Sequence, residues 1–233
     1  MYVASFLLAL SAVGVGADLA AQSPDAAPWT VLPEESVFAV VTEKAGFAAR
    51  LAHNHLIVAS DYNVALDFDP DRPSATAFEF EARVAGLLVD SAEERMEWES
   101  AIEAIDLVSE LGTPGEDDRR KIREEMLADG QLDAEEHPTL SARLVAVREE
   151  ISAFGSVEFS HVAEVEVQIR GQSVVKDVSA RFQIDEADEN RVNIEVVGQF
   201  MFEEFGIEPY SAFMGSVKNK NEFYIYLNLK GTR

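Results

Sequence analysis

VEFSHVAEVEVQIRGQSVVKDVSARFQIDEADENRVNIEVVGQFMF, residues 157–202, is the stretch that decides the fold. Every second residue from Val157 to Ile169 is apolar except His161, and the residues between them are mostly acidic or polar. Side chains of a strand point alternately to opposite faces, so this pattern predicts one buried and one solvated face. The alternation returns after Gly171 and again after Asn190. Three long strands joined by short polar turns predict an antiparallel meander.

The same alternation extends to both sides of the meander. Further strands are expected over residues 36–44, 56–68, 78–84, 140–144 and 218–230. The period changes to a helical one over residues 91–108 and 113–130, which predicts two helices inserted between the third and fourth strands. The sequence therefore predicts one all-β domain of roughly eight antiparallel strands. Closure into a barrel is favoured because it leaves no unpaired strand edge.

Charge narrows the range of partners. The chain has 43 acidic and 19 basic residues, a formal charge of −24. Such a charge repels nucleic acid and anionic membrane surfaces, so neither is expected as a partner. A homodimer is left open.

The first residues predict export. The run from Val3 to Gly16 is apolar and too short to span a bilayer comfortably, which is typical of a secretory signal. Cleavage after Ala17 or Ala21 would leave residues 22–28 as a flexible lead-in and residues 29–231 as the domain. We expect residues 1–21 to be a signal peptide and the protein to be periplasmic or secreted. The start lacks Lys and Arg, and an uncleaved anchor is the alternative. With no cysteine in the chain, disulfides give no indication of compartment.

Five short motifs occur in an order that resembles the YceI-like polyisoprenoid-binding proteins. They are WTVLPEESVFAVV from Trp29, LDFDP at residues 66–70, LDAEEHPTL at residues 132–140, VQIRGQS at residues 167–173 and FGI at residues 205–207. His137 stands where the family usually has Tyr, and the link after the third strand is longer, helical and acidic here. The resemblance covers roughly residues 29–230. It implies an exported, lipocalin-like barrel that is not an enzyme and holds an isoprenoid or quinone-like lipid, with no other cofactor.

A ligand-binding lumen is also a reasonable reading of the residues themselves. An eight-stranded barrel can enclose one small ligand, and bulky inward residues beside small ones either fill the interior or line a slot. Both outcomes stay open at this point. The residues expected to line the lumen are Phe38, Val40, His53, His55, Val58, Tyr62, Phe78, Phe80, Phe159, His161, Phe182, Phe200, Phe202 and Ile225.

The histidines offer a different hypothesis. In an extended chain His53 and His55 lie on one face, and a third histidine, His161 or His137, would complete a zinc site with hydrolytic potential. Contact with a ligand head group and a purely structural role are the alternatives. His161 is the odd inward residue, and we expect it either to bond to Tyr62, His53 or His55 within the lumen or to lie at the barrel mouth. We find no nucleophile motif in the sequence. A third hypothesis is a filled barrel that acts through protein partners.

Overall fold

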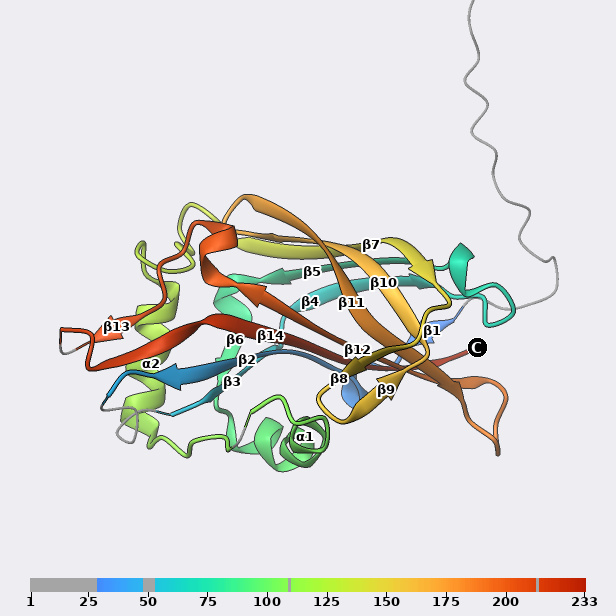
Figure 1. Cartoon of the computed structure of the whole chain (residues 1–233), viewed down its shortest axis with the longest axis horizontal. Coiled ribbons are helices and arrows are strands. Elements are labelled where there is room, and N and C mark those ends of the chain that lie inside the picture. Colours follow the sequence, from blue (N-terminus) through green and yellow to red (C-terminus); the bar gives the residue numbers. More distant parts are fainter. Residues whose placement is uncertain (1–28, 48–52, 109, 213) are drawn as a thin grey trace, which may run out of the picture.

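The structure is a computed structural model and describes residues 29–47, 53–108, 110–212 and 214–233. The predicted signal peptide and lead-in lie outside these residues. Within them, one antiparallel sheet dominates (Figure 1). Its hydrogen-bonded order is β4-β5-β7-β10-β11-β12-β14-β2-β3-β6, and the short strands β1 and β13 pair with β14. The bounds of these strands are β1 Thr30–Val31, β2 Val37–Ala45, β3 His55–Ala59, β4 Tyr62–Asp67, β5 Ala77–Arg83, β6 Leu87–Val89, β7 Thr139–Arg148, β10 His161–Ile169, β11 Gln172–Ile184, β12 Arg191–Met201, β13 Ser211–Ala212 and β14 Val217–Thr232.

The sheet curls so that backbone hydrogen bonds connect the two ends of this order. Strands β3 and β4 are separated only by Ser60 and Asp61, and β5 and β6 only by the 3-10 turn η4 (Val84–Gly86). The Ser60 N–H donates to the Gly86 carbonyl at 3.2 Å, and the Arg83 N–H donates to the Asp61 carbonyl at 2.9 Å. The ladders β3–β6 and β4–β5 are thereby joined. This arrangement fits the predicted all-β antiparallel barrel, although the predicted count of about eight strands is not confirmed.

The predicted meander is present as β10, β11 and β12, which pair antiparallel in chain order. The tight turn after β10 uses Arg170 at φ 50° and Gly171 at φ 72°, a left-handed conformation that glycine adopts without a Cβ penalty. One detail of the prediction was wrong. The alternation from Val157 to Ile169 is not one strand, because it is interrupted at Ser160. The first part is β9 (Val157–Phe159), which pairs with β8 (Ser152–Phe154) in a separate two-stranded sheet.

Two helices follow β6 and precede β7 in the chain. Helix α1 (Ala92–Ala104) begins after Ser91, whose side chain makes no capping hydrogen bond. Helix α2 (Glu116–Leu127) begins two residues after Pro114. The Arg123 side chain of α2 donates to the carbonyls of Ala85 (2.5 Å) and Leu87 (3.2 Å), which holds α2 beside β6. No helix in the described residues is long and apolar enough to cross a lipid bilayer.

Helix α1 and the β8–β9 hairpin cover the outer face of part of the sheet (Figure 1). Trp98 and Ile102 of α1 belong to a buried cluster with residues of β2, β3, β12 and β14, which we call the outer core. Its buried members are Val37, Ala39, Val41, Leu56, Val58, Trp98, Ile102, Ile105, Leu107, Val108, Leu111, Phe159, Val197 and Tyr226. Three further 3-10 turns complete the described elements, η1 (Pro33–Glu35), η3 (Pro73–Ala75) and η5 (Phe202–Phe205).

Candidate functional site

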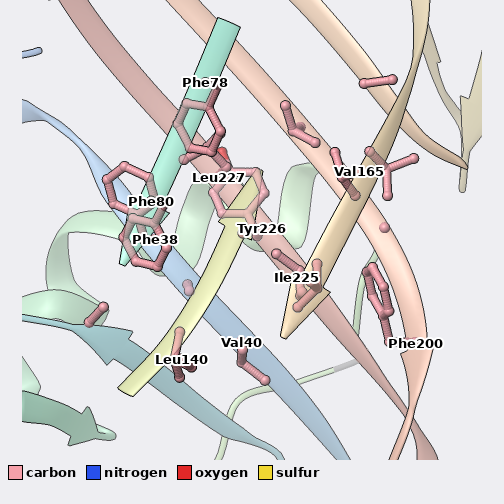
Figure 2. Close-up of a pocket in the computed structure, with 18 of the residues that line it drawn as sticks. Phe38, Val40, Phe78, Phe80, Leu140, Val165, Phe200, Ile225, Tyr226 and Leu227 are labelled. Atoms are coloured by element: carbon pink, nitrogen blue, oxygen red, sulfur yellow. The ribbon is translucent and has the colours of Figure 1, made fainter. Parts of the chain in front are cut away.

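The inner face of the curled sheet surrounds an elongated cavity of about 250 Å³ (Figure 2). Its lining comes from every long strand of the main sheet. The apolar lining residues are Phe38, Ala39, Val40, Ile57, Ala59, Leu66, Phe68, Pro73, Phe78, Phe80, Leu87, Met126, Leu132, Leu140, Ala142, Leu144, Val147, Ala163, Val165, Val167, Ile169, Val178, Ala180, Phe182, Ile194, Val196, Gly198, Phe200, Phe202, Phe205, Ile207, Phe223, Ile225, Leu227 and Leu229.

The inner face keeps accessible surface in the middle of the sheet. Val40, Val165 and Ile225 lie on central strands with their side chains toward the cavity, yet they are only half-buried (Figure 2). Val197 and Tyr226, which point to the other side of the same sheet, are fully buried beneath α1 and the β8–β9 hairpin. Close-packed interiors leave few voids larger than a water molecule. The interior is therefore a lumen and not a filled core.

Aromatic rings gather at two levels of the cavity. Phe38 stacks on Phe80 with ring centroids 4.4 Å apart, and Phe78 lies beyond them, 6.5 Å from Phe38 (Figure 2). At the other level Phe202 and Phe223 have centroids 4.8 Å apart, with Phe200 6.0 Å from Phe223. Such pairs favour tilted or offset arrangements and position large apolar surfaces without polar contacts.

Two polar residues of the lining direct their polar groups outward. Arg181 lies between Ala180 and Phe182 on β11, so strand alternation turns its side chain to the outer face. There it forms an ion pair with Glu195 and lies over the Phe159 ring, 5.0 Å from the centroid. The Tyr226 hydroxyl donates to the same carboxylate at 2.9 Å. Burial and the Glu195 carboxylate raise the pKa of Tyr226, which keeps the phenol protonated as a donor.

The predicted lumen residues divide into two groups. Those that line the cavity are Phe38, Val40, Phe78, Phe80, His161, Phe182, Phe200, Phe202 and Ile225. Those that lie elsewhere are His53, His55, Val58, Tyr62 and Phe159. Val58 and Phe159 belong to the outer core, and Tyr62 packs against Phe38 at 4.7 Å between centroids but does not reach the cavity.

Val58 and Phe159 lie outside the lumen for two different reasons. Phe159 has the same parity as the inward residues of β10, but β9 pairs with β8 in a separate hairpin that packs into the outer core. Val58 precedes Ser60-Asp61, and this two-residue interruption changes the inward face between β3 and β4. A shift of one residue moves a strand's whole apolar set to its other face. On β3, Ile57 and Ala59 consequently line the cavity in place of Leu56 and Val58.

His53 and His55 have structural contacts outside the cavity. The His55 Nδ1 lies 2.7 Å from the Asp90 carboxylate, which is fully buried and also accepts the Leu56 N–H at 2.9 Å. His53 packs against the backbone of Gly112, where an added Cβ would approach its Cβ to 2.2 Å. Asn54 between them is buried, donating to the Glu110 carbonyl and accepting the Lys44 N–H. This stretch ties β3 to β2, β6 and the loop after α1.

The predicted zinc site does not assemble in the described residues. The rings of His53 and His55 are 6.4 Å apart between centroids, and neither His161 nor His137 joins them. His161 contacts Ser160 and Phe182, whereas His137 lies against Gly171 at the opposite end of β10. Among the residues the structure describes, no group of three His, Asp or Glu side chains is placed to hold a metal ion.

Several lining residues escaped the sequence prediction because they lie outside strands. Met126 at the end of α2, Leu132 in the following loop, and Phe205 and Ile207 after β12 line one end of the cavity. The apolar positions of the second predicted helix and the Phe-Gly-Ile motif were visible in the sequence, but nothing in it assigned them to the lumen. We call the end of the cavity that is lined by Met126, Leu132, Phe205 and Ile207 the α2 end.

Side-chain-to-backbone hydrogen bonds hold the α2 end together. Arg170 donates to the carbonyls of Asp129 (2.8 Å) and Gly206 (3.2 Å), and Gln131 donates to the Glu208 carbonyl at 3.0 Å. These bonds link the loop after α2 to the β10–β11 turn and to the segment after η5.

A second depression adjoins the cavity at its other end. It is lined by Asp71, Arg72, Pro73, Ser74, Val147, Glu149 and His161, and we call it the polar vestibule. Pro73, Val147 and His161 also line the cavity, so the two spaces share a boundary. His161 therefore lies at the boundary between the cavity and the polar vestibule.

Fold and site together define a class, a curled antiparallel β-sheet protein with an apolar lumen. Several solved structures have a similar fold. BcnA of Burkholderia cenocepacia aligns with a TM-score of 0.56 and 12% identity over 86% of this chain and 99% of that one. A mutant YceI protein of Campylobacter jejuni, crystallised with monobromobimane, aligns with a TM-score of 0.50 and 11% identity over 76% and 84% of the two chains.

A third structure is a polyisoprenoid binding domain from Saccharophagus degradans, with a TM-score of 0.48 and 6% identity over 88% of this chain and 98% of that one. No protein-family model matches the chain, and no curated protein matches its sequence. The resemblance to YceI-like proteins predicted from the five motifs is thus supported by the fold.

Proposed function

We propose that the chain is an exported, non-catalytic protein that binds one long apolar lipid of isoprenoid or quinone type in its lumen. The observation that carries this proposal is the apolar lumen itself, with half-buried Val40, Val165 and Ile225 in the middle of the sheet. The short links between β3 and β4 and between β5 and β6 are compatible with a lipocalin-like barrel of about eight strands. The five sequence motifs support the same ligand class. Export rests on the apolar run of residues 3–16.

Apolar contact alone supplies enough free energy for such a ligand. Each methylene transferred from water into an apolar site contributes about 0.8 kcal/mol, so a long chain binds without any charged partner. Pockets that hold small molecules are usually apolar concavities with a few polar groups. The candidate ligand-binding residues are the predicted lumen residues that line the cavity, namely Phe38, Val40, Phe78, Phe80, His161, Phe182, Phe200, Phe202 and Ile225.

The first test is organic extraction of the protein purified from its native host, followed by mass spectrometry. We expect an isoprenoid or quinone lipid in a near-stoichiometric amount. The stripped protein should regain thermal stability when that lipid is added, because a ligand that binds only the folded state stabilises it. A clean extract together with no gain in stability would contradict the proposal.

A matched pair of variants tests the location. Val165→Phe places a ring in the lumen, whereas Val175→Phe makes the same change at a position that is 50% exposed. We expect Val165→Phe to abolish the fluorescence gain of N-phenyl-1-naphthylamine and Val175→Phe to leave it unchanged. Equal binding by the two variants would show that the dye lies elsewhere.

A further inference from the structure

The two ends of the lumen differ chemically. At the α2 end, apolar Met126, Leu132 and Ile207 line the cavity beside Gln131, whose side-chain N–H groups already donate to the Gly130 and Glu208 carbonyls. At the vestibule end, the lumen meets His161. β10 runs from one end to the other, and its nine residues span about 30 Å at the usual rise per residue. A ligand that fills the lumen thus meets a polar environment at one extremity.

His161 has a ring nitrogen to spare. Its side chain is turned inward on β10, and only 9% of the residue is exposed. The Nδ1 lies 2.8 Å from the Ser160 hydroxyl, and the ring packs on Phe182 with centroids 5.2 Å apart. Among the hydrogen bonds of the described residues, none uses the Nε2. A neutral imidazole donates from one nitrogen and accepts at the other, so the Nε2 can serve either role.

Thr76 adds a second unsatisfied group at the same end. Its backbone N–H donates to the Pro73 carbonyl at 3.1 Å, and Pro73 belongs to both the lumen and the vestibule. Thr76 lines the lumen, and its buried hydroxyl has no hydrogen-bond partner among the described residues. A buried polar group without a partner costs free energy, and such groups call for an explanation. A polar atom of a ligand would satisfy it.

The charges around the vestibule exclude an anionic partner. Asp71 and Glu149 are exposed in its wall. Although desolvation acts to raise it, hydrogen bonds from Arg72 and from the Asp71 backbone hold the pKa of Asp69 below its usual value, so Asp69 is ionised. The Arg72 guanidinium is held by Asp69 at 2.8 Å, and Arg148, next to Val147, pairs with Asp177 and Glu150. Both cations are therefore matched by carboxylates, and the wall carries net negative charge.

We infer, on the basis of the proposed function, that the ligand lies with its polar end at His161 and Thr76. We further infer that this end is an uncharged hydrogen-bonding group. A hydroxyl, a phenol or a quinone carbonyl satisfies both side chains. A phosphate or carboxylate would face Asp71 and Glu149, and the one cation among the described residues that line the vestibule, Arg72, is already paired with Asp69. The tail extends along β10 toward the α2 end.

Three probes with the same carbon skeleton test this inference on the full chain. Farnesol, farnesyl phosphate and the hydrocarbon 2,6,10-trimethyldodecane are titrated against bound N-phenyl-1-naphthylamine. In the wild type we expect farnesol to bind about threefold to tenfold more tightly than the hydrocarbon, which is the range for one or two neutral hydrogen bonds. Farnesyl phosphate should bind more weakly than farnesol.

Two pairs of variants locate the head group. His161→Leu and Thr76→Val should each lower the farnesol-to-hydrocarbon ratio while hydrocarbon binding persists. The matched controls are His137→Leu, at the far end of β10 and outside the lumen, and Thr42→Val, which removes the other unpartnered hydroxyl of the lining. Both controls should keep the wild-type ratio.

The outcomes separate this inference from the proposed function. If the hydrocarbon binds but farnesol shows no advantage, or if farnesyl phosphate binds most tightly, the head-group inference is wrong and the lipid-binding proposal stands. If Thr42→Val loses the preference for farnesol and His161→Leu keeps it, the polar end of the ligand lies at the opposite end of the lumen, and the head-group inference is also wrong. If no probe displaces the dye, both proposals fail.

Discussion

Val196 and Val197 are neighbours on β12, and their side chains lie on opposite faces of the sheet. Val197 is fully buried in the outer core, against a helix and a hairpin supplied by the chain itself. Val196 is half-buried and lines the lumen. Both faces of the sheet are apolar here, but only the outer face is filled by protein. The chain can therefore derive its stability from one face and leave the other for a ligand.

The largest expected effect comes from opening the outer core. Ile102→Ala removes the fully buried side chain of α1 that packs beneath β2 and β3. We expect a loss of about 2–5 kcal/mol in the free energy of unfolding, which is the usual range when a buried isoleucine is truncated to alanine and leaves a cavity. Urea unfolding measures it, provided that the slope with denaturant stays constant. A loss below 1 kcal/mol would mean that α1 does not stabilise the sheet.

A smaller effect separates the two faces of one strand. Val197→Ala should cost about 2 kcal/mol, from two methyl groups at about 0.8 kcal/mol each plus the cavity left behind. Val196→Ala makes the same chemical change but only enlarges an existing lumen, so its cost should stay below about 1 kcal/mol. The pair is compared by denaturant midpoints in lipid-free protein. Equal costs would indicate that the inner face is as well packed as the outer one.

The smallest effect is alkaline sensitivity of the outer face. Burial and the nearby Glu43 carboxylate raise the pKa of Tyr224 to about 12, and burial raises that of Tyr226 as well. Because the folded-state pKa of Tyr224 lies above the ordinary tyrosine value of 10.0, the stabilisation is fully present below pH 10. It is lost as the pH rises through about 12.

Unfolding by urea at pH 9 and pH 11.5 measures this loss. The Tyr224→Phe variant should show a smaller decline in stability between the two pH values than the wild type. The inner neighbours Phe223 and Ile225 do not titrate. A decline that is identical in wild type and variant would place its origin at groups other than Tyr224, such as Tyr226.

The alternation of the sequence predicted the β class, the antiparallel meander and a large part of the lumen. Phe38, Phe80, Phe182 and Phe200 lie where the period of two put them, because their strands are long and uninterrupted. The pattern could not reveal an interruption of one or two residues. At Ser60-Asp61 the chain changes its inward face, and at Ser160 it passes from the β8–β9 hairpin into the main sheet. Phe159 and Val58 were assigned to the lumen for that reason.

The outer core was the least predictable part. Sequence periodicity marks Trp98 and Ile102 as one side of a helix, but it does not say which strands that side covers. Tyr224 and Tyr226 were expected to face outward, and they do, yet they are covered by α1 and the β8–β9 hairpin. His55 and Asp90 contact each other although they are 35 positions apart in the chain. Their contact follows from the pairing of β3 with β6, which no local pattern encodes.

Strand β14 lies between β12 and β2 and also pairs with β1 and β13. Its contacts with β2 join residues as far apart in the chain as Val37 and Asn228. Until β14 is in place, β2 and β12 each present an unpaired edge, which is a template for aggregation. Such long-range pairing also makes folding slow, because the conformational entropy of the long intervening loop is lost before any stabilising contact forms. We therefore expect the sheet to close late in folding, when β14 joins β2 to β12.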